Sequence, residues 1–431
     1  MNLPWWVPAA VLVAGFAVLV GMGAQGAGAV VFLALAAVAL TIVARAMRTP
    51  ADHDWLPRWI ALGFAAKLAG SFARFAMVRW IYGYGDAVGY YQTASRMAAT
   101  WRSGRVPELS GTGSVGTQIV EWLTGLMFAV FTPDLLGGFV IFAVLAFFGQ
   151  LLLYAAFRRW AKPHHLKPYA ALLFLLPTFA FWPSSIGKDA LVILGLGLAA
   201  YGVSRVLERF QLRWIAAMGL GLAALGAIRL HIAALVVGGA AAAALFARPP
   251  VRGGGNGLRR LAFLGGCTAA GLLVLLLLPE LLGFRLEDTQ DLEFITSEVV
   301  RRTSERGTVA SGGPVTGPAD VPAGLALVLF RPFVFEASEP QHLLAALETT
   351  FLLVLVLWRL PAMLGNLGTW RRTGYLVFCT FYTLAFAIAF SAVRNLGIIA
   401  RQRGQVLAMF LAVVILLGWP DPKPRRSLTD L

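Results

Sequence analysis

Three short segments of the 431-residue chain place acidic and basic side chains where chemistry on an anionic substrate is expected. The first is GDAVGYY at positions 85–91, in which Asp86 begins a predicted amphipathic helix, because Tyr90 and Ala94 follow at helical spacing. A carboxylate in this position can take a proton from a hydroxyl group or bind a divalent cation. Simple capping of the helix by Asp86 is an equally good interpretation, and both stay open.

The second segment is FWPSSIGKD at positions 181–189, a tight turn that leads into another apolar helix. Lys188 and Asp189 would begin that helix, whose N-terminal dipole favours a bound anion. The competing interpretation is again capping, by Ser185 or Asp189, with the Lys188 amine extended toward the membrane surface. This segment therefore predicts a phosphate or metal site next to Asp86 if the two turns share one face of the membrane.

The third segment, at positions 394–403, carries three arginines within ten residues: Arg394, Arg401 and Arg403. Guanidinium groups bind phosphate oxygens in pairs, so this cluster is suited to a lipid pyrophosphate, although a lipid-headgroup anchor would look the same. Three further residues are candidates for the same cluster: Arg229 and His231 at a predicted helix junction, and Arg331, which lies near Glu336. Lys67, Ser71 and Arg74 share one face of an earlier apolar helix, for which a structural ion pair with Glu348 is the alternative.

The composition indicates the solvent in which these residues must be positioned. The chain is 58% hydrophobic and 13% charged, with a mean hydropathy of +0.74, whereas a soluble domain carries about 25% charged residues. A chain this apolar is expected to be a polytopic membrane protein, which excludes a soluble enzyme, a secreted disulfide scaffold and a nucleic-acid binder. Cys267 and Cys379 lie in apolar runs and form no zinc-binding pattern, so no metal ligands are assigned.

Hydrophobic segments of about 20 residues predict an all-α bundle with about twelve spans. The predicted spans are 5–23, 27–46, 58–82, 135–157, 168–184, 188–206, 212–229, 232–247, 260–280, 342–360, 374–393 and 403–419. The first lacks a basic N-terminal region, so we expect a retained span and not a cleaved signal peptide.

Charge in the short loops predicts the orientation of the bundle. More than half of the 36 Lys and Arg residues fall on one side if the N-terminus is cytoplasmic, which is the positive-inside pattern. Both termini are then cytoplasmic, in a bacterial inner membrane, and two long loops, 83–134 and 281–341, lie outside. The apolar stretch 119–131 is short for a span, so we expect a juxtamembrane helix there, with a short span as the alternative.

The order of these features resembles the GT-C superfamily of membrane glycosyltransferases. In that superfamily a span leads to an outer loop, in which an acidic residue begins a juxtamembrane helix. A second surface helix follows, and the next span ends in basic residues. Residues 58–210, which include loop 83–134, show this order. The resemblance implies Asp86 as general base or metal-site carboxylate and Asp189 as its partner. Residues 1–57 would be two extra N-terminal spans, and 211–431 a C-terminal bundle with loop 281–341. The Arg401-Gln402-Arg403 segment also resembles envelope polysaccharide polymerases.

The expected function is transfer of a sugar from a polyprenyl-linked donor to an envelope glycan or lipid acceptor at the outer face, with membrane lipids and no nucleic acid as partners. The donor phosphate would lie among Lys188, Arg394, Arg401 and Arg403, and Tyr90 and Tyr91 would stack on sugar rings. No cofactor is assigned beyond a divalent cation as an option at Asp86. A lipid-linked glycan polymerase or ligase, a lipid or polysaccharide transporter, and a scaffold subunit remain alternatives. The scaffold alternative predicts that Asp86, Lys188 and Arg401 lie far apart.

Overall fold

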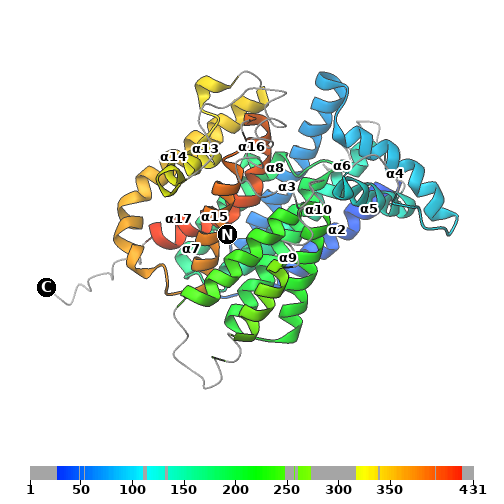
Figure 1. Cartoon of the computed structure of the whole chain (residues 1–431). Helices are drawn as coiled ribbons and strands as arrows, with labels where there is room; N and C mark the ends of the chain where they lie inside the picture. The colour runs from blue at the N-terminus through cyan, green and yellow to red at the C-terminus, as the bar shows by residue number, and fades with distance from the viewer. Residues whose placement is uncertain are drawn as a thin grey trace, which may run out of the picture.

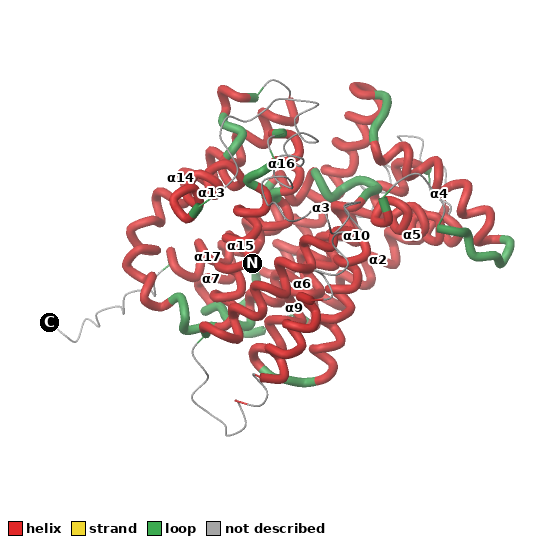
Figure 2. Tube along the Cα trace, in the orientation of Figure 1, coloured by secondary structure: helices red, strands yellow, loops and turns green. Residues whose placement is uncertain are grey.

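The protein is a bundle of helices (Figures 1 and 2), and no strand occurs among the residues that the structure describes. The structure is a computed structural model that describes residues 27–47, 49–52, 54–109, 114–131, 134–247, 257, 261–272, 317–337, 340–393 and 395–419. The predicted first span, most of loop 281–341 and Arg394 lie outside these residues.

Six helices in the described ranges are long and apolar enough to cross a membrane. They are α2 (Ala27–Ala46), α3 (Leu56–Ala76, extended by the π-helical turn η1, Met77–Tyr82), α6 (Leu135–Arg158), α9 (Lys188–Glu208), α10 (Leu212–Phe246) and α14 (Pro340–Asn366). A seventh crossing results if the bent pair α16 (Leu396–Gln402) and α17 (Gly404–Gly418) spans the membrane as one unit. The structure therefore supports a membrane-embedded helical bundle, whereas the predicted number of about twelve spans is not reached in the described residues.

Helix α10 consists of two arms that meet at Arg229, whose backbone is not helical (φ −148°, ψ 82°). The first arm runs antiparallel to α9, because Gly202 packs on Met218 while Gly195, nearer the start of α9, packs on Leu225. The backbones approach closely at Gly202, and the Leu225 side chain packs on Gly195, so the first arm is tightly held against α9. It therefore brings Arg229 to the end of the bundle at which α9 begins, which we call the site end.

The second arm of α10 returns along α15 (Gly374–Phe390). His231, just after the kink, packs against Phe390 at the end of α15, and Phe246, at the far end of the arm, stacks on Phe381. Arg371, which precedes α15, donates a hydrogen bond to the carbonyl of Phe246. The two arms form a helical hairpin with Arg229 at its tip, in the ranges that the sequence predicted as two separate helices.

The predicted single helix 168–184 is interrupted. Helix α7 (Pro163–Leu175) ends before α8 (Pro177–Phe181), because Leu176 precedes a proline and adopts an extended conformation with ψ 135°. Helix α8 is held by two buried charges, since the Thr178 amide donates to Glu348 and Lys67 donates to the Phe179 carbonyl. The described residues therefore show no ion pair between Lys67 and Glu348, which was the structural alternative for Lys67.

Two amphipathic helices lie on the site end, α4 (Asp86–Arg102) and α5 (Val115–Phe131), and Figure 1 shows them side by side beyond the bundle. The first turn of α5 approaches Ile228 beside the hairpin tip, and its last residue, Phe131, packs on Phe32 near the start of α2. Both neighbours belong to the site end, so α5 lies across that end and does not run through the bundle. Helix α5 includes the apolar stretch 119–131, for which the sequence predicted a juxtamembrane helix.

The region predicted as loop 281–341 contains a helix that the sequence analysis did not anticipate. Helix α13 (Val321–Phe330), preceded by the short η3 (Pro318–Asp320) and followed by η4 (Val334–Glu336), buries Leu327, Val328 and Leu329. Helices α16 and α17 meet at an angle of 60°, and the buried Arg403 lies at this corner. Arg403 donates hydrogen bonds to the Val328 and Arg331 carbonyls, which join the end of α13 to the corner. The short 3₁₀ helix η5 (Leu367–Thr369) follows the C-terminal end of α14.

Candidate functional site

A polar cavity of about 510 Å³ opens at the site end of the bundle. Helices α4 and α5 contribute one wall, which we call the α4–α5 wall: Asp86, Gly89, Tyr90, Thr117 and Glu121. The start of α9, the tip of the α10 hairpin and α16 contribute the other, which we call the cationic wall: Lys188, Arg229, Ile398, Arg401 and Gln402. Segments between residues 86 and 402 thus meet at one place, which is the geometry of a binding site.

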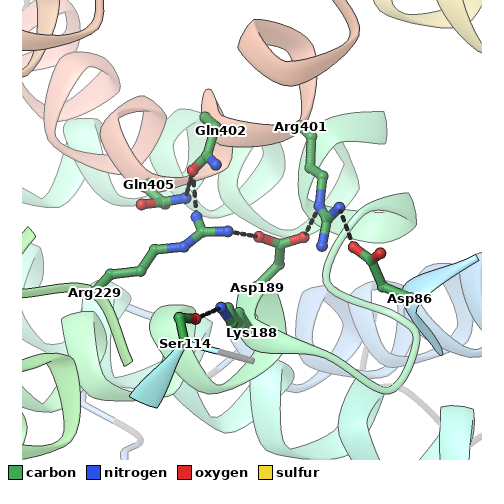
Figure 3. Close-up of polar contacts among 8 residues, drawn as sticks. All are labelled: Asp86, Ser114, Lys188, Asp189, Arg229, Arg401, Gln402 and Gln405. Carbon is green, nitrogen blue, oxygen red and sulfur yellow. Dashed lines mark hydrogen bonds and ion pairs between the residues drawn. The ribbon is translucent and has the colours of Figure 1, made fainter. Parts of the chain in front are cut away.

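Asp189 lies at the base of the cationic wall and binds two arginines (Figure 3). One carboxylate oxygen accepts from Arg229 at 2.9 Å, and the other pairs with the Nε atom of Arg401. The Asp189 side chain is only 10% exposed. A buried carboxylate held between two guanidinium groups is already neutralised, so Asp189 orients the arginines and is poorly placed to accept a further proton.

Asp86 differs from Asp189 in its exposure. Its carboxylate approaches one terminal nitrogen of Arg401 at 3.3 Å, and its side chain is 66% exposed. Arg401 therefore joins the two acids from opposite sides, as Figure 3 shows. Because an exposed pair at this distance is weak, Asp86 is the acid of the site that remains available to a ligand.

Neither acid caps its own helix through its side chain. The N-cap of α4 is Gly85 (φ 143°), and the N-cap of α9 is Gly187 (φ 157°), conformations that residues with a Cβ rarely adopt. A glycine N-cap has no side chain to satisfy the first helical amides, and the acids that follow are directed to Arg401 and Arg229 instead. The capping interpretation of Asp86 and Asp189 is therefore not what the contacts show.

Lys188 extends in another direction from its neighbour Asp189. Its amine donates to the Ser114 hydroxyl at 3.0 Å, just before α5 begins, and it lines the cavity. This contact links the cationic wall to the α4–α5 wall. An ammonium group has three donors, and a hydroxyl uses one of them, so Lys188 retains the capacity to bind an anion.

Gln402 was not among the predicted site residues, yet it fixes the tip of the hairpin. Its side-chain carbonyl accepts from Arg229 and from Gln405, as drawn in Figure 3. Arg229 is thus held by an amide on one side and a carboxylate on the other. The only sequence signal for this role was the position of Gln402 next to Arg401.

The α4–α5 wall is ordered by hydrogen bonds between its own side chains. The Tyr90 phenol is hydrogen-bonded to Thr117, and the Glu121 carboxylate is hydrogen-bonded to Thr93. Burial raises the pKa of both groups, with the nearby Asp86 carboxylate raising that of Tyr90 further. Thr117 and Glu121 were not predicted; in sequence they appear only as ordinary positions of an apolar surface helix.

Arg74 lies next to the site, although the cavity lining does not include it. Its guanidinium is stacked over Phe181 and Trp182, at 5.2 and 5.3 Å from the ring centres, and the charges of Arg401, Asp189 and Asp86 act on it. Cation–π stacking holds a guanidinium without using its N–H donors. The predicted shared face of Lys67, Ser71 and Arg74 divides accordingly, with Lys67 bound to α8 and Arg74 near the cavity.

Several predicted site residues lie elsewhere. His231 packs against Phe390, with ring centres 5.7 Å apart, and Tyr91 packs against Phe128 at the same separation. Arg403 is fully buried at the α16–α17 corner, where backbone carbonyls bind it. The cavity lining contains none of these three, and Arg394 lies outside the described residues.

Arg331 is paired with Glu336 near the end of α13 and also lies outside the lining. Burial opposes ionisation of Glu336, but hydrogen bonds from the Arg331 side chain and the Phe333 amide lower its pKa overall. The Arg331 guanidinium is thus committed to a local pair.

The acids of the cavity do not form a metal-ligand set in the described ranges, where no three His, Cys, Asp or Glu side chains gather in a way that could hold a metal ion. Asp86 and Asp189 are bridged by a guanidinium group instead. Comparison with known proteins adds no assignment: no family model, no curated protein and no solved structure matches the chain.

Proposed function

We propose that the protein is a membrane glycosyltransferase that moves a sugar from a polyprenyl-linked donor to a glycan or lipid acceptor at the site end, the outer face of a bacterial inner membrane. The observation that supports this proposal most directly is the single cavity shared by Asp86, Lys188, Arg229 and Arg401. A scaffold subunit has no need to gather charges from four helices, and it predicts that they lie apart.

The donor phosphate binds to the cationic wall in this mechanism. Lys188 has unused donors, and Arg401 exchanges its weak contact with Asp86 for a phosphate oxygen. Negative charge on that phosphate grows as the glycosidic bond breaks and its electron pair moves to the phosphate oxygen. Cations held in place beforehand by Asp189 and Gln402 stabilise this charge more in the transition state than in the ground state.

Asp86 acts on the acceptor. Its exposed carboxylate takes the proton of the acceptor hydroxyl while that oxygen forms the new bond to the anomeric carbon. Transfer of Arg401 from Asp86 to the phosphate leaves the carboxylate free for this task. General-base catalysis of this kind contributes about 10²–10⁴ in rate. Asp189 is assigned as a positioning residue, which changes the catalytic role that the sequence suggested for it.

A polymerase or ligase of lipid-linked glycans would use the same cavity and the same acid, and differs only in the size of the transferred group. A lipid or polysaccharide transporter is the second candidate, and one observation favours it. Helices are interrupted at Leu176, Arg229 and Arg403, and transporters bind substrates at interrupted helices. Two of these interruptions adjoin the site, at Arg229 and beside Arg401.

The experiment that tests the proposal is sugar transfer in membrane vesicles that contain the full chain or its Asp86→Asn variant. Vesicles receive polyprenyl monophosphates that carry a tritiated hexose, and label in glycan or lipid product is counted. We expect Asp86→Asn to lower the transfer rate by about 10²–10⁴ because the base is lost. A transporter moves labelled donor across the membrane without forming product, so the assay separates the two candidates.

Asp134→Asn is the matched control. Asp134 belongs to the same predicted outer loop, but it caps α6 by accepting the Gly137 amide at 2.7 Å and is not part of the cavity lining. Asparagine caps helices as well as aspartate does, so this variant should fold and transfer normally. Wild-type transfer rates in Asp86→Asn vesicles would overturn the proposal.

A further inference from the structure

The α4–α5 wall of the cavity has a different chemistry from the cationic wall. It presents the Glu121 carboxylate, the bonded pair Tyr90 and Thr117, and the bare backbone at Gly89. None of these groups is cationic, and the Glu121 carboxylate repels an anion, so this wall is poorly suited to the phosphate of the donor. A cavity of about 510 Å³ lies within the range of roughly 300–1,000 Å³ typical of small-molecule sites, and has room for more than a phosphate group.

Gly89 lines the cavity at an open position, which we call the Gly89 slot. It lies one helical turn after Asp86 on α4, and a Cβ atom built at Gly89 meets no other atom within 4 Å. Several helical glycines in the core of this protein approach a neighbouring backbone, as Gly70 and Gly149 do. Gly89 therefore serves no packing function; its lack of a side chain leaves space beside the exposed carboxylate of Asp86.

Glu121 lines the same space from α5. Its hydrogen-bond partner among the described residues is the Thr93 hydroxyl, and a carboxylate offers about four acceptor positions. Lys188 and Arg96 lie close enough to favour its ionised form, although burial opposes ionisation. An ionised carboxylate with spare acceptor positions binds hydroxyl groups and repels a second anion.

We propose that the α4–α5 wall is the acceptor subsite and takes an uncharged polyhydroxylated molecule, such as the end of a glycan, with one ring in the Gly89 slot and its hydroxyl groups bonded to Glu121. The name acceptor rests on the proposed function; the existence and chemistry of the subsite do not. The cavity then holds an anion on the cationic wall and a neutral polyol on the α4–α5 wall, where Asp86 contacts Arg401 of the cationic wall.

Saturation-transfer difference NMR tests this subsite on the full chain in detergent, with methyl glycosides of glucose, mannose and galactose as probes. We expect at least one probe to receive saturation, and Gly89→Val to reduce that signal more than fivefold by filling the slot. Valine has a higher helix propensity than glycine, so this variant should fold. Glu121→Gln should weaken binding of the same probe by about tenfold, since a charged hydrogen bond contributes roughly 1.5 kcal/mol or more.

Gly238→Val provides the matched control, because Gly238 is also a helical glycine with no atom within 4 Å of its Cβ position, and it lies on α10 away from the cavity. It should leave the signal unchanged. Geranylgeranyl phosphate, a short polyprenyl phosphate, should not displace the bound glycoside, because the two ligands use different walls.

Three results would overturn the subsite: no saturation of any methyl glycoside, an unchanged signal in Gly89→Val, or full displacement of the glycoside by geranylgeranyl phosphate. None of these results depends on sugar transfer. If Gly89→Val leaves the glycoside signal unchanged while Asp86→Asn lowers sugar transfer as expected, the proposed function stands without the subsite. If Gly89→Val lowers the signal while Asp86→Asn leaves sugar transfer unchanged, the protein has a polyol-binding slot, and the proposed function is wrong.

Discussion

The Asp189 carboxylate and the Arg401 guanidinium, 212 positions apart in the chain, form an ion pair at the base of the cavity. Arg401 reaches Asp86 with another nitrogen, so one side chain from α16 connects the starts of α4 and α9. One guanidinium group thus links three helices at the site end. Its removal has consequences for both structure and binding, and these can be measured separately.

Asp189→Asn should destabilise the protein and leave Arg229 and Arg401 without their shared counter-charge. Removal of one partner from a buried ion pair costs on the order of 3–5 kcal/mol, because the remaining charge stays buried. We expect a lower midpoint of thermal unfolding in detergent. We also expect a lower rate of sugar transfer by the variant protein that remains folded in vesicles.

Glu208→Gln is the control for this change, because Glu208 ends the same helix and pairs with Arg159 and Arg205 at the opposite end of the bundle. Its side chain is 26% exposed, and loss of such a pair costs about 1 kcal/mol or less. Equal destabilisation by the two substitutions would show that the Asp189 pair is an ordinary surface contact.

Arg401→Gln should weaken binding of geranylgeranyl phosphate. Hydrogen bonds to charged groups contribute about 1.5–3 kcal/mol, so the dissociation constant should rise by roughly ten- to a hundredfold. Isothermal titration at two salt concentrations measures this effect, and the wild-type affinity should fall with added salt more steeply than that of the variant.

Arg371→Gln is the matched substitution at the opposite end of the bundle, where Arg371 donates to the Phe246 carbonyl. A headgroup anchor would respond to loss of either arginine. If both variants bind geranylgeranyl phosphate equally well, Arg401 has no special role in binding the anion.

The helices of the bundle were predictable where hydrophobic length alone decides them. The expected ranges 58–82, 135–157 and 188–206 correspond to α3 with η1, α6 and α9 within about two residues. The prediction was wrong where a local break competes with hydrophobicity. Pro177 splits the expected helix 168–184, and α13 was missed because its ten apolar residues are too few to signal a span.

The candidate site was predictable from the free-energy cost of placing charged side chains at the ends of apolar helices, because such charges need partners. The structure brings together five of the predicted residues: Asp86, Lys188, Asp189, Arg229 and Arg401. Arg403 carried the same signal but turns inward, because the bend between α16 and α17 directs it to the carbonyls at the end of α13. Sequence spacing could not reveal that bend. Nor could it distinguish Gln402 and Glu121 from ordinary polar positions, since their roles depend on contacts between distant helices.

Gly70→Ala should displace the turn that carries the site. A Cβ at Gly70 would lie 1.8 Å from the Ala180 carbonyl oxygen, so α3 and α8 must separate to admit it. Overpacking of this kind costs about 1–3 kcal/mol, and the movement is passed to the turn before Lys188. Gly219→Ala, where nothing lies within 4 Å, should unfold at or above the wild-type temperature. Equal unfolding temperatures for the two variants would contradict the close approach of α3 and α8.

Glu121→Gln should be at least as stable as the wild type at neutral pH, even though it weakens polyol binding. Burial raises the pKa of Glu121 in the folded protein above its value in the unfolded chain, so the ionised form costs stability. That cost is fully present above the folded pKa and disappears as the pH falls through the folded pKa toward the unfolded value. Thermal unfolding of both proteins between neutral and acidic pH should therefore show an advantage for Glu121→Gln that shrinks on acidification. An advantage that grows as the pH falls would mean that Glu121 is stabilised as a carboxylate, by the nearby Lys188 and Arg96, more than burial destabilises it.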